Sequence, residues 1–129
     1  MFSADISLLL LRLVLGLIFV VHGWPKIRNL KMTAHHFESM GFHPGNLWGT
    51  VVALVEFFGG LAVFFGFFSH LGALGIAIVM LVSVFWKMSK GQGLVGGFEL
   101  DLVLLAVAIA VLLLGSGGYS IERSMIGGY

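Results

Sequence analysis

The sequence predicts an all-α integral membrane protein, a compact four-helix transmembrane bundle that forms one domain of 129 residues. Of these residues, 59% are hydrophobic and only 10% are charged, whereas an average soluble domain is about 45–50% apolar and about 25% charged. The apolar residues also fall into four runs, each close to the roughly 20 residues that a helix needs to cross a bilayer. Lipid is therefore the solvent that suits these segments.

The first apolar run, residues 6–24, is predicted to be the first membrane helix. Only Arg12 interrupts the run, and we expect Pro25 to end it because proline lacks the N–H group that continues a helix. No basic segment precedes the run, and no small-residue cleavage site follows it. We therefore expect the helix to stay in the membrane rather than to be removed as a signal peptide.

The other three apolar runs are predicted to form helices over residues 49–68, 71–87 and 98–114. Only two residues separate the second and third runs, so these helices are expected to form a tight antiparallel hairpin. The fourth run ends in a segment rich in glycine and serine. The chain is thus predicted to cross the membrane four times.

Two connections, residues 25–48 and 88–97, are expected on the same side of the membrane. The first is predicted to contain a short amphipathic helix in the membrane interface, with one face formed by Leu30, Ala34, Phe37 and Met40 and the other by Lys31, His35 and Glu38. The second connection is glycine-rich and is expected to be a flexible turn.

Basic residues gather near these two connections, so the positive-inside rule predicts that both loops are cytoplasmic and both termini lie outside. The loop-side bases are Lys26, Arg28, Lys31, Lys87 and Lys90, against Arg12 and Arg123 toward the other side.

Arg12 and Glu56 fall inside predicted membrane helices, where a charged side chain costs about 2.5–3.5 kcal/mol on insertion scales. If the helix ends at residues 24 and 49 are level, Glu56 lies about 10 Å and Arg12 about 18 Å below the loop-side surface. An arginine side chain covers most of that difference, so we predict an ion pair between the two residues. The alternative is that Arg12 extends to the outer interface.

Further polar residues are predicted at one depth beneath the loops. His22 lies near the loop-side end of the first helix, at the depth of Glu99 and Asp101 near the start of the fourth. Lys26 is expected at the rim and Glu56 slightly deeper. Together these residues form a candidate pocket in the loop-side leaflet.

The two acids of the fourth helix differ in their predicted orientation. Glu99 shares a helix face with Ala106 and Ala110, a small-residue face suited to inward packing, whereas Asp101 is expected to reach the interface. Both could instead be acids that interact favourably with a helix N-terminus. The candidate ligand-binding or buried polar cluster is therefore Arg12, His22, Lys26, Glu56 and Glu99.

Glycines in the predicted helices are interpreted as packing residues that let two backbones approach closely. These are Gly23, Gly59, Gly60, Gly72 and Gly75.

No haem or metal site is predicted. The sequence has no cysteine, which excludes cysteine-ligated iron–sulfur clusters and thiol relays. His22 and His70 fall at opposite ends of the bundle, and the adjacent His35 and His36 would point about 100° apart on a helix. Nucleic acid is not expected as a partner, because seven scattered Lys and Arg residues form no basic stripe.

The order and spacing of these residues resemble the DoxX family of small bacterial and archaeal membrane proteins. The resemblance covers almost the whole chain and is carried by Arg12, His22-Gly23, Lys26, Glu56, Gly59-Gly60, Gly97-Phe98-Glu99 and the segment from Gly115 to Arg123. It implies a place in the cell inner (plasma) membrane and a quinone-linked redox setting, because relatives include subunits of quinone-linked oxidoreductases. Many relatives carry an aromatic residue shortly after the acid at the start of the fourth helix, where this chain has Leu100-Asp101-Leu102.

Two functions remain open at this point. The first is a membrane subunit of an oxidoreductase complex, with a quinone as the possible cofactor and a soluble or membrane partner that supplies electrons. The second is a non-catalytic scaffold or a small-solute transporter whose buried charges fix helix register. Membrane lipid and a second copy of the chain are further possible partners.

Overall fold

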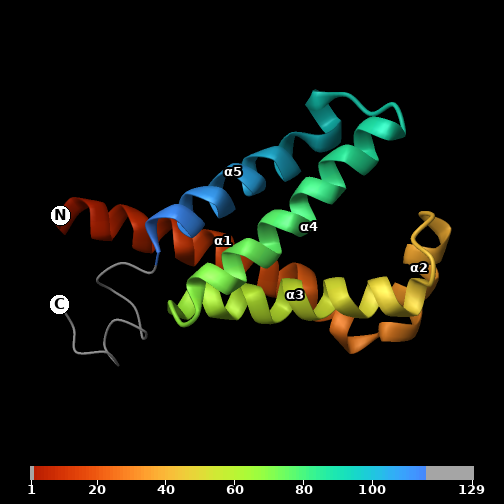
Figure 1. Cartoon of the computed structure of the whole chain (residues 1–129), viewed down its shortest axis with the longest axis horizontal. Helices are drawn as coiled ribbons and strands as arrows, with labels where there is room; N and C mark the ends of the chain where they lie inside the picture. The colour runs from red at the N-terminus through yellow and green to blue at the C-terminus, as the bar shows by residue number, and fades with distance from the viewer. Residues whose placement is uncertain (1, 116–129) are drawn as a thin grey trace.

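The computed structural model describes residues 2–115, and the regular structure in this part of the chain is helical (Figure 1). In chain order the elements are α1 (Phe2–Arg28), α2 (Leu30–Ser39), α3 (Gly45–Phe65), α4 (Ser69–Ser89), the short kinked segment η1 (Leu94–Phe98), whose backbone is not helical at Val95 and Gly96, and α5 (Glu99–Leu114). Four spans in this part are long and apolar enough to cross a membrane: α1, α3, α4, and η1 together with α5. The predicted all-α transmembrane fold is confirmed. Residue 116 and those after it, including Arg123 of the family pattern, lie outside the described residues.

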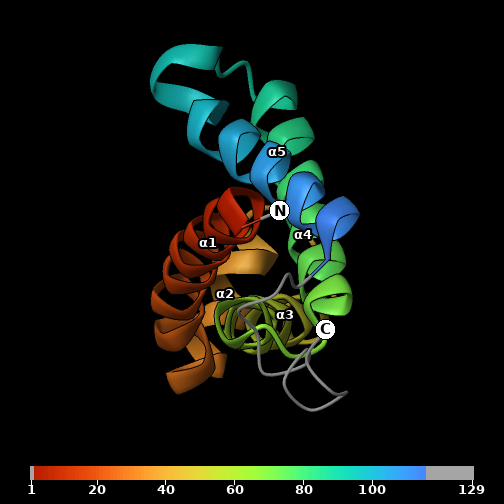
Figure 2. The same ribbon diagram turned by 90° about the vertical axis from the view of Figure 1, so that its left-hand side faces the viewer.

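The four long helices form two antiparallel pairs. α1 packs along α3 and α5 along α4, whereas α1 and α5 contact each other over a shorter stretch. The α4–α5 pair diverges from the α1–α3 pair toward the end of the molecule that holds α2 and η1 (Figures 1 and 2). The bundle is therefore more open than predicted, and its opening is at the loop side.

The first helix is longer than predicted, because Pro25 does not end it. α1 continues to Arg28, since proline near a helix end removes only one backbone hydrogen bond and its φ angle suits a helix. The reversal comes instead at Asn29, whose backbone N–H still donates to Pro25 O (3.2 Å) and whose side chain accepts from Met32 N (3.1 Å) as the N-cap of α2.

The predicted interfacial connection contains the helix α2. It runs crosswise to α1 and α3 (Figure 1), buries Thr33 and Phe37 and leaves Leu30 and Met32 exposed. The crosswise direction suits a helix that lies along a membrane surface.

The second predicted helix is shifted toward the N-terminus. α3 begins at Gly45 and ends at Phe65 rather than near residue 68. Gly66 follows in the left-handed conformation (φ 73°), which glycine adopts without a steric penalty and which commonly ends a helix. The tight turn into α4 follows directly.

Close glycine contacts set how the helices pack. A Cβ atom at Gly60 would lie 2.8 Å from Val20 N of α1, and one at Gly72 of α4 would lie 2.8 Å from Gly59 O of α3. Only glycine permits these approaches, and backbone proximity of this kind is what holds helices together in lipid. A Cβ at Gly23 would lie 2.6 Å from Phe57 N, and one at Gly75 would lie 2.9 Å from the side-chain atom Val55 Cγ1.

Candidate functional site

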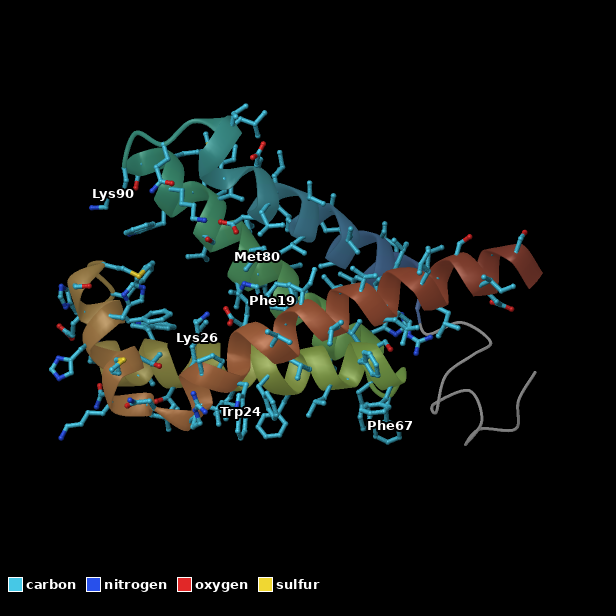
Figure 3. The ribbon with its side chains drawn as sticks, turned by 180° about the vertical axis from the view of Figure 1, so that it is seen from behind. Phe19, Trp24, Lys26, Phe67, Met80 and Lys90 are labelled. Carbon is cyan, nitrogen blue, oxygen red and sulfur yellow. The ribbon has the colours of Figure 1, made fainter. Side chains whose placement is uncertain are left out.

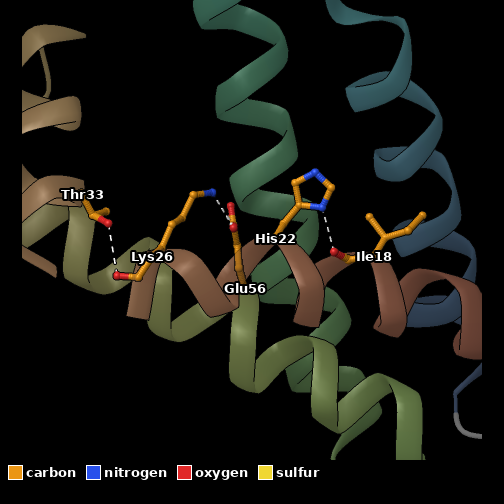
Figure 4. Close-up of polar contacts among 5 residues, drawn as sticks. All are labelled: Ile18, His22, Lys26, Thr33 and Glu56. Atoms are coloured by element: carbon orange, nitrogen blue, oxygen red, sulfur yellow. Dashed lines mark hydrogen bonds and ion pairs between the residues drawn. The ribbon is translucent and has the colours of Figure 1, made fainter. Parts of the chain in front are cut away.

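An ion pair between α1 and α3 forms the centre of the polar site. Lys26 Nζ lies 2.6 Å from Glu56 Oε1 (Figure 4). The Glu56 side chain is 5% exposed and that of Lys26 is 30% exposed. A buried carboxylate is costly unless a charge partner and hydrogen bonds compensate it. Lys26 supplies both, with its stem along the helix and its ammonium group near the surface.

The backbone around Lys26 also connects the pair to α2. The single O–H of Thr33 Oγ1 is shared between two carbonyl oxygens, Lys26 O (3.1 Å) and Asn29 O (3.0 Å). The lysine is therefore positioned by the turn between α1 and α2.

His22 lies one helical turn before Lys26 on the same face of α1 (Figure 4). Its Nδ1 is 2.8 Å from Ile18 O. Because a carbonyl oxygen can only accept a hydrogen bond, Nδ1 must carry the proton. In the neutral ring Nε2 then presents a lone pair, and since the His22 side chain is exposed, this atom can accept a hydrogen bond from a ligand.

Arg12 does not belong to this cluster, and the predicted ion pair between Arg12 and Glu56 is wrong. The Arg12 guanidinium is buried and donates to Val63 O from Nε (3.0 Å) and to Phe64 O from Nη2 (3.1 Å). These carbonyls are in the last turn of α3, where the helix dipole is negative; Val63 O also accepts from the backbone N–H of Gly66 (3.3 Å). Arg12 thus stabilises the far end of α3, at least about 10 Å along the helix from Glu56.

The error has a physical cause in the register of α1 against α3. The prediction placed residues 24 and 49 at one level. In the structure Gly23 lies against Phe57, and Gly16 lies against Gly60 and Phe64, because a Cβ added at either glycine would meet these residues. The glycine contacts therefore shift α3 by about two turns relative to the prediction. Gly16 was not identified from the sequence, although its spacing of seven residues from Gly23 was a usable signal.

The acids of α5 have the opposite roles to those predicted. Asp101 is buried, and its Oδ2 lies 2.8 Å from Lys87 Nζ and accepts a hydrogen bond from Ser83 Oγ (2.7 Å). Glu99 is exposed, and its Oε1 accepts from the backbone N–H of Gly96 (3.2 Å). Glu99 is therefore a local cap at the start of α5 rather than part of a buried cluster.

The reversal follows from which face of α5 packs inward. The buried residues are Asp101, Leu104, Ala108 and Val111, whereas Ala106 is exposed and Ala110 only partly buried. In lipid, helix composition alone does not identify the packed face, because apolar side chains suit both environments. Ser83 and Lys87, four residues apart on α4, were the missed signal for a partner of Asp101.

A third polar group lies where α2 leads into α3, with Glu38 and His43 outside the membrane spans and Gly45 at the start of one. Glu38 Oε1 accepts from Gly45 N (2.7 Å) and its Oε2 lies 2.6 Å from His43 Nδ1. The Gly45 N–H and then the His43 ring hold the pKa of the exposed Glu38 carboxyl below its ordinary value. This contact joins the end of α2 to the start of α3.

The chain is similar to known membrane proteins. The DoxX family model matches residues 7–89, a range that contains His22, Lys26 and Glu56 but not Asp101. A Bacillus subtilis (strain 168) protein named "Putative oxidoreductase CatD" is 32% identical over 114 residues, which are 88% of this chain and 83% of the relative. An Escherichia coli (strain K12) protein named "Inner membrane protein YqjF" is 33% identical over 121 residues, 92% of each chain. No solved structure matches the chain significantly.

Proposed function

The chain belongs to the DoxX family of membrane proteins, and from this premise we propose that it is the membrane subunit of a quinone-linked oxidoreductase complex. In this proposal His22, Lys26 and Glu56 bind the polar head of a quinone at the loop-side leaflet. The name of the Bacillus subtilis relative contains the word oxidoreductase, which supports a redox setting.

One observation carries the proposal: the His22 ring is fixed beside the Lys26–Glu56 ion pair, between the loop-side part of α1 and the middle of α3 (Figure 4). A quinone head has oxygens that accept hydrogen bonds in the oxidised form and donate them in the reduced form. Lys26 Nζ has three N–H donors, and His22 Nε2 can accept. This set of donors and acceptors fits both redox forms of the head.

When bound, a quinone would supply two-electron chemistry coupled to two protons. His22 is suited to hold one of these protons, because Ile18 O fixes its Nδ1–H and leaves the Nε2 lone pair as the acceptor. Lys26 is one helical turn nearer the loop side, and 30% of its side chain is exposed. In this proposal it connects the His22 ring to the aqueous surface.

The electrons come from a partner subunit in this proposal. The chain has no cysteine, so it has no thiol relay or cysteine-ligated cluster of its own. We further propose a location in the cell inner membrane with both loops cytoplasmic, which the name of the Escherichia coli relative and the basic loop-side residues support.

A second function, that of a non-catalytic scaffold, is favoured by a different observation. Within residues 2–115, two lysine–carboxylate pairs each join the helices of one antiparallel pair, Lys26–Glu56 in the first and Lys87–Asp101 in the second. Such pairs could serve only to fix helix register. Transport is less well supported, because the irregular backbone at Val95 and Gly96 lies before α5 rather than in the middle of a span.

The test is to purify the full chain in mild detergent and to quantify extracted quinone by mass spectrometry. We expect a stoichiometric quinone in the wild type and its loss in His22→Ala and Glu56→Gln. Matched controls are His70→Ala, an exposed histidine on α4, and Glu99→Gln, an exposed acid on α5; both should retain the quinone. If quinone is absent from all samples, or is lost equally in the controls, the quinone site is rejected and the scaffold function is favoured.

A further inference from the structure

An apolar groove of about 280 Å³ lies between α1 and α5. It is lined over residues 10–18 of α1 and 100–107 of α5, and the lining side chains are all leucine, valine or isoleucine. Val14 and Val103 are 52% and 57% exposed, so the groove is open along its length to the lipid. It follows the seam where the two helix pairs contact each other least.

The loop-side end of the groove leads directly to the proposed head-group site. α1 approaches the loop side and α5 departs from it (Figure 1), so Ile18 and Leu100 form this end. Ile18 O is also the acceptor for His22 Nδ1. The groove therefore begins about one helical turn below the His22 ring and extends about 12 Å along α1 toward the opposite leaflet.

We propose that this groove binds the isoprenoid chain of the quinone, and that the protein selects quinones by their tail as well as by their head. The inference rests on the proposed function, because His22 fixes where the head lies. The lining offers no polar group, so only a hydrocarbon can fill it without leaving a hydrogen bond unmade. A quinone carries a single chain, which suits a single groove, whereas a phospholipid carries two chains and a charged phosphate.

The expected energetic gain is modest. A tail that leaves the bilayer for the groove exchanges one apolar environment for another, so packing rather than the hydrophobic effect provides the preference. Phe19 of α1 and Met80 of α4, labelled in Figure 3, belong to the buried core rather than to the lining of the groove.

The experiment uses the full chain in lipid nanodiscs with two quinone probes that share one head, one with a long isoprenoid tail and one without a tail. The readout is the ratio of long-tailed to tail-less quinone retained, by mass spectrometry. Val103→Phe fills the groove, and Leu102→Phe is the matched control, an exposed neighbour on the same helix that does not line it. Both positions face lipid, so both variants should fold.

We expect Val103→Phe to lower the ratio about tenfold, equivalent to about 1.4 kcal/mol, and Leu102→Phe to leave it unchanged. Val14→Phe against Leu17→Phe repeats the comparison on α1. Quinone bound with the same ratio in all variants would overturn the tail site while the proposed function stands. Loss of co-purified phospholipid instead of the tailed quinone would also overturn it. No quinone of either kind on the wild type would overturn both proposals.

Discussion

Lys26 Nζ lies 2.6 Å from Glu56 Oε1, so an ion pair with an almost completely buried carboxylate connects α1 to α3. The second helix pair repeats this relationship, with Lys87 Nζ 2.8 Å from Asp101 Oδ2 between α4 and α5. In both pairs the lysine is near the end of the first helix and the acid is on the second. Each pair thus combines a snorkelling cation with a carboxylate that could not be buried alone.

The Lys26–Glu56 pair predicts that removing the lysine alone destabilises the protein more than removing both charges. Lys26→Met leaves the Glu56 carboxylate buried without its charge partner, and we expect the free energy of unfolding to fall by about 1–3 kcal/mol. Lys26→Met combined with Glu56→Gln should recover part of this loss, because the buried charge is gone. Thermal unfolding in detergent measures both variants. A double variant that is no more stable than Lys26→Met would contradict the pairing.

Arg12 is predicted to act on stability and not on ligand binding. Arg12→Leu removes the donors to Val63 O and Phe64 O, and charged hydrogen bonds of this kind contribute about 1.5–3 kcal/mol each. We expect a lower melting temperature but an unchanged quinone content per folded protein. Arg28→Leu, at an exposed arginine on the loop side, is the control and should leave the melting temperature unchanged. Quinone loss from folded Arg12→Leu protein would place this residue back in the site.

The two acids of α5 give a direct comparison. Asp101→Asn weakens the contacts with Lys87 and Ser83, and we expect a loss of about 1–3 kcal/mol in unfolding free energy. Glu99→Gln changes an exposed side chain and should stay within about 0.5 kcal/mol of the wild type. Chemical or thermal unfolding of both variants measures these two changes in unfolding free energy. Equal effects would mean that Asp101 is not the inward-facing acid.

The helices could be predicted from the sequence, but their register could not. Runs of about 20 apolar residues leave few alternatives to membrane helices, since every backbone polar group must be satisfied within lipid. The pairing of Arg12 with Glu56 failed because it took the loop-side ends of the two helices as level, whereas α3 extends about two turns beyond the end of α1. Contacts of glycines such as Gly16 with the facing backbone fix the register, and one sequence does not specify which glycines meet.

The candidate site was predicted in part for a similar reason. His22, Lys26 and Glu56 were identified because ionisable groups in lipid need partners, although the partner chosen for Glu56 was wrong. Asp101 was assigned to the interface because small residues pointed to another face of α5. Hydrophobic patterning separates core from surface in water, but both faces of a membrane helix are apolar.

Packing between α3 and α4 predicts a sharp contrast between two glycine variants. A Cβ at Gly72 would lie 2.8 Å from Gly59 O, whereas a Cβ at Gly93 meets nothing within 4 Å. Gly72→Ala forces these helix backbones apart, and we expect a cost of about 1–3 kcal/mol despite the better helix propensity of alanine. Gly93→Ala should be neutral. Melting temperatures of the two purified variants test this, and equal values would contradict the close contact.

The Glu38 contact at the junction of α2 and α3 predicts a pH dependence outside the membrane. The Gly45 N–H and His43 lower the pKa of Glu38 in the folded protein below its ordinary value of 4.5. A carboxyl whose pKa is lower in the folded state stabilises it above the ordinary pKa, and this contribution is lost as pH falls through the lowered value. We therefore expect the amide resonance of Gly45 to shift with a midpoint below pH 4.5, as followed by NMR. Glu38→Gln should abolish this transition, and a wild-type midpoint at or above the ordinary value would mean that the carboxylate does not hold the start of α3.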